Sequence, residues 1–326
     1  MNAQQLVNSI IPHKNPAQIG KGKAAINIAL SKYWGKREVE LNLPTNSSLS
    51  ISLPDLGTET TIEATDTNND EIFLNGKLLS PNETFAKRLS LFLDYFRDGQ
   101  HFKVTTTNTV ATAAGLASSA SGYAALVLAL NDCFQWQLNS KQLSILARLG
   151  SGSASRSIYD GFVIWHKGQQ ADGLDSYAEP MNIVWTDFCI GLIKIDTSAK
   201  KIGSTQGMQN TVKRCDLYQA WPEKAEKDLL KIKQAIETKD FKTLGETAEN
   251  NALSMHATMI ATIPPILYWQ PESVKAMHKV WELREQGVVV YFTMDAGPNL
   301  KLLFLENELE KVKETFKDLI IIKPFN

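Results

Sequence analysis

Hydrophobic and polar positions alternate along the first third of the chain in short runs, which turn-forming residues interrupt. This period of two predicts β-strands, because successive side chains of a strand point to opposite faces. The predicted strands are AAINIALSKYW (beginning at Ala24), SSLSISL, TETTIEAT, EIFLNGKLL and KVTTTNT. Within EIFLNGKLL, Asn75, Gly76 and Lys77 lie between two apolar runs, which indicates a β-hairpin.

Apolar residues three and four positions apart predict helices elsewhere. One predicted helix runs from Asn82 to Phe96 with a single apolar face, made of Phe85, Leu89, Phe92, Leu93 and Phe96. A long apolar helix is predicted over residues 118–134. The later elements are a strand DFCIGLIKID, the helices PEKAEKDLLKIKQAIE, FKTLGETAENNALSMHATM and ESVKAMHKVWELREQ, a strand VVVYFTMD, a helix NLKLLFLENELEKVKETF and a strand LIIIK.

This order of elements mixes strands and helices without a regular alternation, which indicates an α+β fold and argues against a Rossmann domain. The 326 residues are enough for two domains. Residues 1–22 are polar and show no periodicity, so they are predicted to form an irregular N-terminal extension. The domain boundary is predicted near Asp187, giving an N-terminal domain over 23–187 and a C-terminal domain over 188–326.

The composition excludes several classes of protein. With 34 Lys+Arg and 35 Asp+Glu, the formal charge is −1, which argues against nucleic acid as a partner but allows a small anion in a locally basic pocket. We expect no membrane span and no signal peptide, because neither apolar pattern is present. The three cysteines, Cys133, Cys189 and Cys215, form no CxxC pair and fit a cytoplasmic location, and the histidines lack the spacing of a zinc site.

Residues 113–122 (AAGLASSASG) open the predicted apolar helix and form the first segment that could carry chemistry. Gly115 lets the backbone approach a ligand, and serines at a helix N-terminus can bind phosphate. The alternative is a small-residue loop that allows close helix packing. The residues alone leave both interpretations open.

Two further segments are rich in hydrogen-bond donors. KYWGKRE, from Lys32 to Glu38, places three cations within six residues beside two aromatic residues, although a solvated strand end is the favoured interpretation of this segment taken alone. GSGSASRS, from Gly150 to Ser157, surrounds Arg156 with serines and glycines, which suits a phosphate or a carboxylate. A flexible linker is the alternative, but its place between two apolar segments argues against one.

The fourth segment, FTMDAGPN, places Asp295 at the end of a predicted buried strand. Such an aspartate either caps a turn, which is the more frequent role, or acts as a general base. Together the four segments form a suitable set of groups for phosphoryl transfer to an anionic substrate.

From about Ala24 to about Leu303, the chain resembles the GHMP-type small-molecule kinases and, within them, the diphosphomevalonate decarboxylase family. The motifs that carry the resemblance are NIALSKYWGKRE, LNLPTNSSLS, TAAGLASSASGYAAL, GSGSASRSIYDGF, NNALSMHATM with PPILYW, and FTMDAGPNL. The resemblance implies the GHMP kinase fold. In this fold an N-terminal domain like ribosomal protein S5 domain 2 precedes a ferredoxin-like C-terminal domain, with the site between them.

The implied reaction is the ATP-dependent decarboxylation of mevalonate 5-diphosphate. The 3-hydroxyl is phosphorylated, and phosphate and carbon dioxide then leave to give isopentenyl diphosphate, an isoprenoid precursor. The resemblance also implies a homodimer, ATP, and Mg²⁺ held mainly by phosphates and water rather than by a protein cage. The alternatives are a mevalonate or phosphomevalonate 3-kinase-type enzyme, and a non-catalytic GHMP-fold protein that binds a ligand. The presence of Asp295, Lys32 and Arg156 favours the decarboxylase.

Individual roles follow from the same resemblance. Asp295 matches the general base, or a mainly orienting and electrostatic group, and Arg156 matches the residue that holds the substrate carboxylate. Lys32 matches the lysine near the reacting phosphoryl group, and Asn27 lies near that arginine. The implied substrate contacts are Tyr33, Trp34, Gly35, Lys36, Arg88, Ser151, Gly152, Ser153, Ala154, Ser155, Arg156, Ser204 and Met208. The implied ATP contacts are Asn108, Ala114, Gly115, Leu116, Ala117, Ser118 and Ser119, with Ser118 or Ser119 at the metal-bound γ-phosphate.

The sequence departs from the family pattern at a few positions. Thr205 stands where the family commonly has an arginine, which weakens the expected diphosphate contacts. Arg214 and Cys215 replace a Thr-Ser pair, and Arg214 is a candidate to compensate the lost charge. His256 is expected to be a core or supporting residue rather than a catalytic one.

Overall fold

The structure is a computed structural model that describes residues 1–109, 118–196 and 202–325. Its α-helices are α1 (Ala3–Ile10), α2 (Thr84–Leu93), α3 (Ser118–Phe134), α4 (Ser140–Gly150), α5 (Ser204–Arg214), α6 (Trp221–Thr238), α7 (Phe241–Ile260), α8 (Pro271–Glu285) and α9 (Leu309–Thr315). Its 3-10 helices include η2 (Gly152–Ile158), η3 (Asp216–Ala220) and η4 (Glu306–Glu308).

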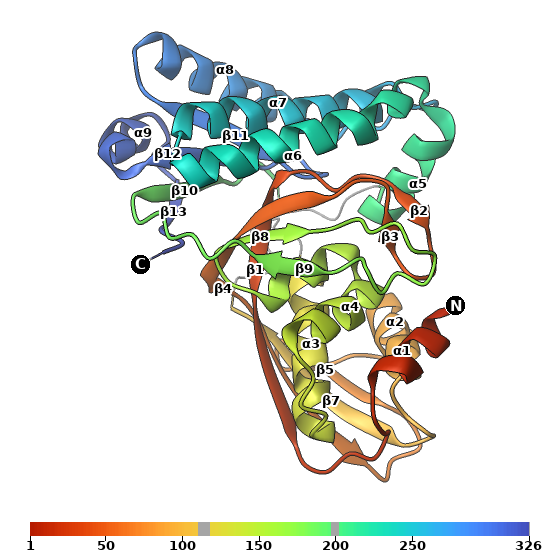
Figure 1. Cartoon of the computed structure of the whole chain (residues 1–326). Coiled ribbons are helices and arrows are strands. Elements are labelled where there is room, and N and C mark those ends of the chain that lie inside the picture. The colour runs from red at the N-terminus through yellow and green to blue at the C-terminus, as the bar shows by residue number, and fades with distance from the viewer. Residues whose placement is uncertain (110–117, 197–201, 326) are drawn as a thin grey trace.

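The strands form two main sheets, one in each half of the chain (Figure 1). The strands are β1 (Gly20–Ser31), β2 (Lys36–Glu38), β3 (Leu43–Pro44), β4 (Ser48–Thr65), β5 (Glu71–Leu74), β6 (Lys77–Leu78), β7 (His101–Asn108), β8 (Phe162–Trp165), β9 (Ala178–Pro180), β10 (Phe188–Ile193), β11 (Val290–Met294), β12 (Leu300–Leu305) and β13 (Ile320–Ile322). The first sheet has the order β6-β5-β7-β4-β8-β9, with β1 also paired to β4, and the second has the order β11-β12-β10-β13. Strands β2 and β3 pair with each other in a short ladder.

The predicted strands SSLSISL and TETTIEAT are parts of one continuous strand, β4. Its pairing with β1 shifts register between Ala25 and Ile26, opposite Gly57. A Cβ at Gly57 would lie 2.2 Å from the carbonyl oxygen of Ala24, so glycine allows this bulge where a turn was expected. The predicted hairpin is confirmed: Asn75 and Gly76 have φ of 50° and 80°, as the two-residue turn requires.

Three predictions about the elements are wrong. Residues 1–22 are not irregular throughout, because α1 begins at a capping box between Asn2 and Gln5 and buries its apolar side chains. Phe85 is 45% exposed, although the other predicted apolar residues of α2 are buried. The predicted helix NLKLLFLENELEKVKETF begins instead with strand β12, because a short run of apolar residues fits a buried strand as well as a helix.

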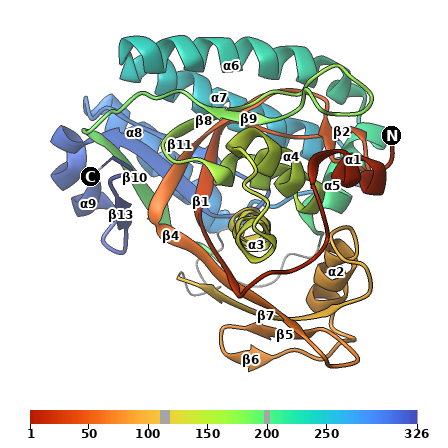
Figure 2. The same cartoon turned by 60° about the horizontal axis from the view of Figure 1, so that its bottom comes forward.

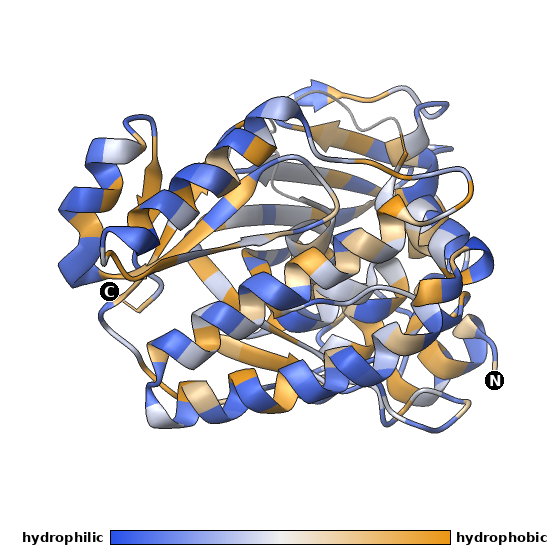
Figure 3. Cartoon of the chain, turned by 90° about the horizontal axis from the view of Figure 1, so that it is seen from above, coloured by the Kyte–Doolittle hydropathy of each residue, from blue (hydrophilic) through white to orange (hydrophobic). Residues whose placement is uncertain are grey.

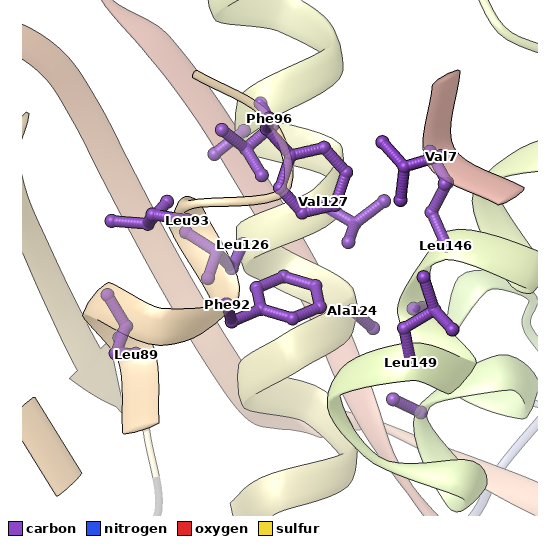
Figure 4. Close-up of a cluster of buried hydrophobic side chains, with 14 of the residues drawn as sticks. Val7, Leu89, Phe92, Leu93, Phe96, Ala124, Leu126, Val127, Leu146 and Leu149 are labelled. Atoms are coloured by element: carbon purple, nitrogen blue, oxygen red, sulfur yellow. The ribbon is translucent and has the colours of Figure 1, made fainter. Parts of the chain in front are cut away.

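The N-terminal half is built around α3, which lies across the sheet beside β1 (Figure 2). Gly20 and Gly22 allow this contact, because a Cβ at either position would lie 2.1 Å from a carbonyl oxygen of α3. Figure 4 shows Phe92 of α2, and Phe96 just after this helix, packed against α3 near Val127. This core fixes the position of the helix that follows residues 110–117.

The two halves share a hydrophobic core (residues of β1, β4 and β8 with residues of β10, α6 and α7). The fully buried members include Ile28 and Leu49 from the first half and Ile190 and Ile232 from the second. Figure 3 shows the alternation of hydrophilic and hydrophobic positions along the helices that cover this core. No helix in the described part of the chain combines the length and apolarity that a membrane span needs.

Candidate active site

Lys32 directly follows β1 and lies where the two halves meet. Its ammonium Nζ donates to the carbonyl oxygen of Ala29 at 2.8 Å and to Oδ1 of Asp295 at 2.8 Å. Its backbone N–H donates to Oδ1 of Asn251, on α7, at 2.8 Å. Burial lowers the pKa of Lys32 to about 8, and the Asp295 charge opposes this shift.

Asp295 follows β11 and contacts a second lysine, Lys301 on β12. Nζ of Lys301 lies 3.0 Å from Oδ2 of Asp295. The Asp295 side chain is 38% exposed, whereas Lys32 and Lys301 are 2% and 4% exposed, so the carboxylate faces open space with both ammonium groups behind it. Burial would raise the pKa of Asp295, but the charges of Lys301 and Lys32 outweigh burial and hold this pKa well below its usual range.

Arg156, on η2, is buried beside β1 and β4. Its Nη1 donates to Oγ of Ser48 at 2.6 Å, and its Nε and Nη2 donate to Oδ1 of Asn27 at 3.3 and 3.2 Å. Asn27 is held in turn by donating to Oγ of Ser157 at 2.8 Å. Arg156 forms no ion pair within the described ranges, and burial lowers its pKa to about 10. A buried guanidinium without a paired anion favours an anionic ligand.

The segments around Lys32 and Arg156 meet at Gly152. A Cβ at Gly152 would lie 2.8 Å from the Trp165 ring and 2.9 Å from the Tyr33 ring, so only glycine fits. The buried hydroxyl of Tyr33 has no hydrogen-bond partner among the described residues, and burial raises its pKa, so it stays protonated. Tyr33 is therefore an available donor for a ligand oxygen.

Gly35 has a backbone conformation that side chains disfavour. Its φ is +113°, and a Cβ there would lie 1.7 Å from the hydroxyl oxygen of Tyr218. That hydroxyl donates to the carbonyl oxygen of Trp34 at 3.1 Å, and the Trp221 indole donates to the same oxygen at 2.9 Å. These contacts fix the chain between Lys32 and Lys36.

Replacing Gly35 with alanine is expected to destabilise the protein by more than about 2 kcal/mol, because the added Cβ meets both the positive φ and Tyr218. The measurement is urea unfolding followed by circular dichroism. Gly76→Ala is the matched control, because Gly76 has φ of +80° with no atom within 4 Å of an added Cβ. Equal losses of stability in the two variants would mean that contact with Tyr218 contributes nothing.

Several of the remaining predicted substrate contacts lie near the segment from Lys32 to Lys36. Lys36 donates to Oδ1 of Asn42, whose amide donates to the carbonyl oxygen of Leu149 at 2.8 Å, just before the segment that begins at Ser151. Burial lowers the pKa of Lys36. The Ser151 and Ser153 hydroxyl oxygens lie 3.3 Å apart. Asn42 therefore links Lys36 to the end of α4, which directly precedes Ser151.

Five predicted substrate contacts fit less directly. Ala154 is fully buried in the N-terminal core, and the buried Ser155 hydroxyl has no hydrogen-bond partner among the described residues. Arg88 is exposed on α2 and has no hydrogen bond or ion pair in the described part of the chain. Met208, on α5, packs in the cluster that contains Trp34, and Ser204 begins the same helix.

The departure at Thr205 is not compensated by Arg214. Both residues are exposed on α5 but lie at opposite ends of this helix. At 1.5 Å per residue, nine positions correspond to about 14 Å, so Arg214 does not take the place of a cation at Thr205.

The predicted ATP contacts lie at and before the start of α3. Ala114, Gly115, Leu116 and Ala117 lie outside the described residues, Ser118 begins α3, and Ser119 is exposed on its first turn. Oδ1 of Asn108 accepts from Oγ1 of Thr58 at 2.9 Å. Within residues 1–109, 118–196 and 202–325, no group of three or more His, Cys, Asp or Glu side chains could hold a metal ion.

The sequence pattern did not indicate that Lys301 contacts Asp295, although a lysine within the apolar run LKLLFL was an available signal. His256, expected to be a core or supporting residue, is buried and contacts the backbone of Asp295: its Nε2 lies 3.1 Å from the Asp295 carbonyl oxygen, and its ring centroid lies 5.4 Å from that of Trp269. Burial lowers the pKa of His256 to about 4, so this ring is neutral near pH 7 and donates to the carbonyl.

Comparison with known proteins identifies the class. The protein MDDEF in complex with MVAPP, AMPPCP and magnesium matches with a TM-score of 0.89 and 43% identity over 94% of this chain and 97% of that chain. A mevalonate diphosphate decarboxylase from Enterococcus faecalis matches with a TM-score of 0.87 and 42% identity over the same shares. The fold and the site thus define an α+β protein of the GHMP kinase class.

The family follows from the sequence. Residues 24–178 match the diphosphomevalonate decarboxylase-like N-terminal domain, and residues 192–324 match the mevalonate 5-diphosphate decarboxylase C-terminal domain. The diphosphomevalonate decarboxylase of Debaryomyces hansenii is 37% identical over 89% of this chain and 80% of its own length. This chain belongs to the diphosphomevalonate decarboxylase family.

Proposed function

We propose that the protein catalyses the ATP-dependent decarboxylation of mevalonate 5-diphosphate to isopentenyl diphosphate, with release of ADP, phosphate and carbon dioxide. The observation that carries this proposal is the arrangement around Asp295, in which an exposed carboxylate stands in front of two buried ammonium groups. The family's activity supports it, and the intact set of Lys32, Arg156 and Asp295 favours the decarboxylase over a 3-kinase or a non-catalytic protein.

In this mechanism Asp295 accepts a hydrogen bond from the 3-hydroxyl and orients it toward the γ-phosphate. Its low pKa makes it a weak base, so we propose that it mainly orients the hydroxyl and takes the proton as the phosphoryl transfer completes. Lys32 lies beside it and offsets the negative charge that develops on the transferred phosphoryl group.

Arg156 would hold the substrate carboxylate, since it is buried, oriented by Asn27 and Ser48, and lacks an anionic partner in the described ranges. Loss of the 3-phosphate leaves positive character on the tertiary C3, and the electrons of the C1–C2 bond form the C2=C3 double bond as carbon dioxide leaves. A fixed carboxylate keeps the breaking bond aligned for this step.

The substrate diphosphate would accept from the Tyr33 hydroxyl, Lys36, Ser151 and Ser153. ATP supplies the phosphoryl group, and Mg²⁺ supplies positive charge on its phosphates. The start of α3 suits an anion of this kind, because the backbone N–H groups and the dipole of a helix N-terminus favour phosphate. We further propose a homodimer that works in the cytoplasm; the three cysteines are all unpaired and buried, which fits a reducing compartment.

The test is to incubate the protein with ATP, Mg²⁺ and mevalonate 5-diphosphate and to follow ADP, phosphate and carbon dioxide. We expect all three in equal amounts. ADP without carbon dioxide would indicate a 3-kinase. No turnover with any mevalonate phosphate would favour a non-catalytic ligand-binding protein.

A further inference from the structure

Lys301 occupies an unusual position for a lysine. It lies on β12 between fully buried leucines and is itself 4% exposed. Its partner in the strand pairing is Thr293 on β11, two residues before Asp295. This register brings Nζ of Lys301 to Oδ2 of Asp295 at 3.0 Å. Burying an ammonium group costs free energy that Asp295 offsets, so the pair is specific rather than incidental.

The two lysines contact different oxygens of the Asp295 carboxylate. Lys32 contacts Oδ1 and Lys301 contacts Oδ2, one from each half of the chain. Among the described residues, the charged and titratable groups that face this carboxylate are Lys32 after β1, Arg156 on η2, Lys301 on β12 and the neutral His256 on α7. Three cations against one carboxylate leave an excess of two positive charges, which suits an anionic substrate.

We infer that Lys301 is a positioning residue for the reaction: by holding Oδ2, it fixes the Asp295 carboxylate in one orientation beside Lys32, with its free lone pairs toward the 3-hydroxyl. This inference rests on the proposed function for the identity of the hydroxyl. Lys301 lies behind the carboxylate and acts through it.

The same contact sets how activity depends on pH. The pKa of Asp295 lies well below its usual range, so the carboxylate stays ionised at pH 5 and above. Removing the Lys301 charge leaves burial opposed by fewer cations, Lys32 and Arg156, so the pKa of Asp295 rises. Activity requires the ionised carboxylate. As the pH is lowered, a variant without the Lys301 charge is therefore expected to lose activity at a higher pH than the unmodified protein does.

The experiment compares Lys301→Gln, which keeps a hydrogen-bond donor without the charge, with Lys301→Arg, which keeps the charge. We expect Lys301→Gln to lower kcat about 30-fold with KM for mevalonate 5-diphosphate changed less than about threefold, and to raise the acidic limb of the kcat profile by about one pH unit. Lys301→Arg is expected to restore the acidic limb and most of kcat. Lys323→Gln is the matched control, because it removes a lysine that pairs with Glu306 on the surface.

Two further measurements separate positioning from a general effect on folding. In the Asp295→Asn background, Lys301→Gln is expected to change residual kcat less than about threefold, because its effect passes through Asp295. A similar loss in both backgrounds, or an unshifted acidic limb, overturns the inference. Carbon-13 NMR titration of the Asp295 carboxyl, assigned with Asp295→Asn, gives a readout without turnover. An upward shift of this titration in Lys301→Gln supports the inference even if mevalonate 5-diphosphate is not the substrate, and an unchanged titration overturns it.

Discussion

Asp295→Asn is expected to lower kcat about 1,000-fold, which is the scale of a lost general base or orienting carboxylate. Asparagine fits the same space but does not accept the 3-hydroxyl proton. Release of ADP and of carbon dioxide should fall together, because the carboxylate acts at the phosphoryl transfer that precedes decarboxylation. Substrate affinity is expected to stay the same or rise, since Lys32 and Lys301 then face the anionic substrate without an opposing charge.

Steady-state kinetics and calorimetric titration with mevalonate 5-diphosphate measure the two effects. The matched control is Asp70→Asn, because Asp70 is also a carboxylate paired with a buried cation: its side chain is 3% exposed and contacts Arg97, 9% exposed, away from the site. This control is expected to lower stability and leave kcat per folded molecule unchanged. A kcat for Asp295→Asn within tenfold of the unmodified protein would contradict the role given to this carboxylate.

Arg156→Gln is expected to lower kcat/KM for mevalonate 5-diphosphate at least 100-fold. Removing one partner of a buried charge pair costs about 2–5 kcal/mol, and the substrate carboxylate would lose its cation here. Arg156→Lys should recover less than about a tenth of this activity, because an ammonium group lacks the planar fork that contacts both Asn27 and Ser48.

The same assay with ATP as the varied substrate shows whether Arg156 binds the substrate carboxylate or the nucleotide. KM for ATP is expected to change little in Arg156→Gln. Arg37→Gln is the control, because Arg37 is exposed and donates to the backbone oxygens of Lys167 and Gln170. A change confined to KM for ATP would contradict the assignment of Arg156 to the substrate carboxylate and would indicate that Arg156 contacts the nucleotide.

The central site residues could be predicted from the sequence because their motifs place them beside strand ends or a closely packed glycine. Lys32 and Asp295 each follow a buried strand, and Arg156 lies in a segment that must pack closely at Gly152. Lys301 was missed because its partner is set by strand register, which the pattern of β12 does not reveal. The same apolar run was predicted as a helix.

Features of packing were also beyond the sequence. The single strand β4 was predicted as two because Gly57 resembles a turn residue, whereas it allows a bulge against β1. α1 was missed because eight residues give too short a periodicity, and its capping box was the better signal. Whether Phe85 is buried depends on which other elements pack against α2, and the helical periodicity alone does not show this.

The hydrophobic core shared by the two halves limits how this chain could be divided. The change from one sheet to the other falls near Asp187 in the sequence, yet Ile28 and Leu49 pack in one cluster with Ile190 and Ile232 across it. A fragment cut there would carry half of that cluster on its surface, where exposed apolar patches promote aggregation. The two halves are therefore expected to be stable together rather than as separate fragments, and a substitution at Ile28 is expected to disturb the packing of both.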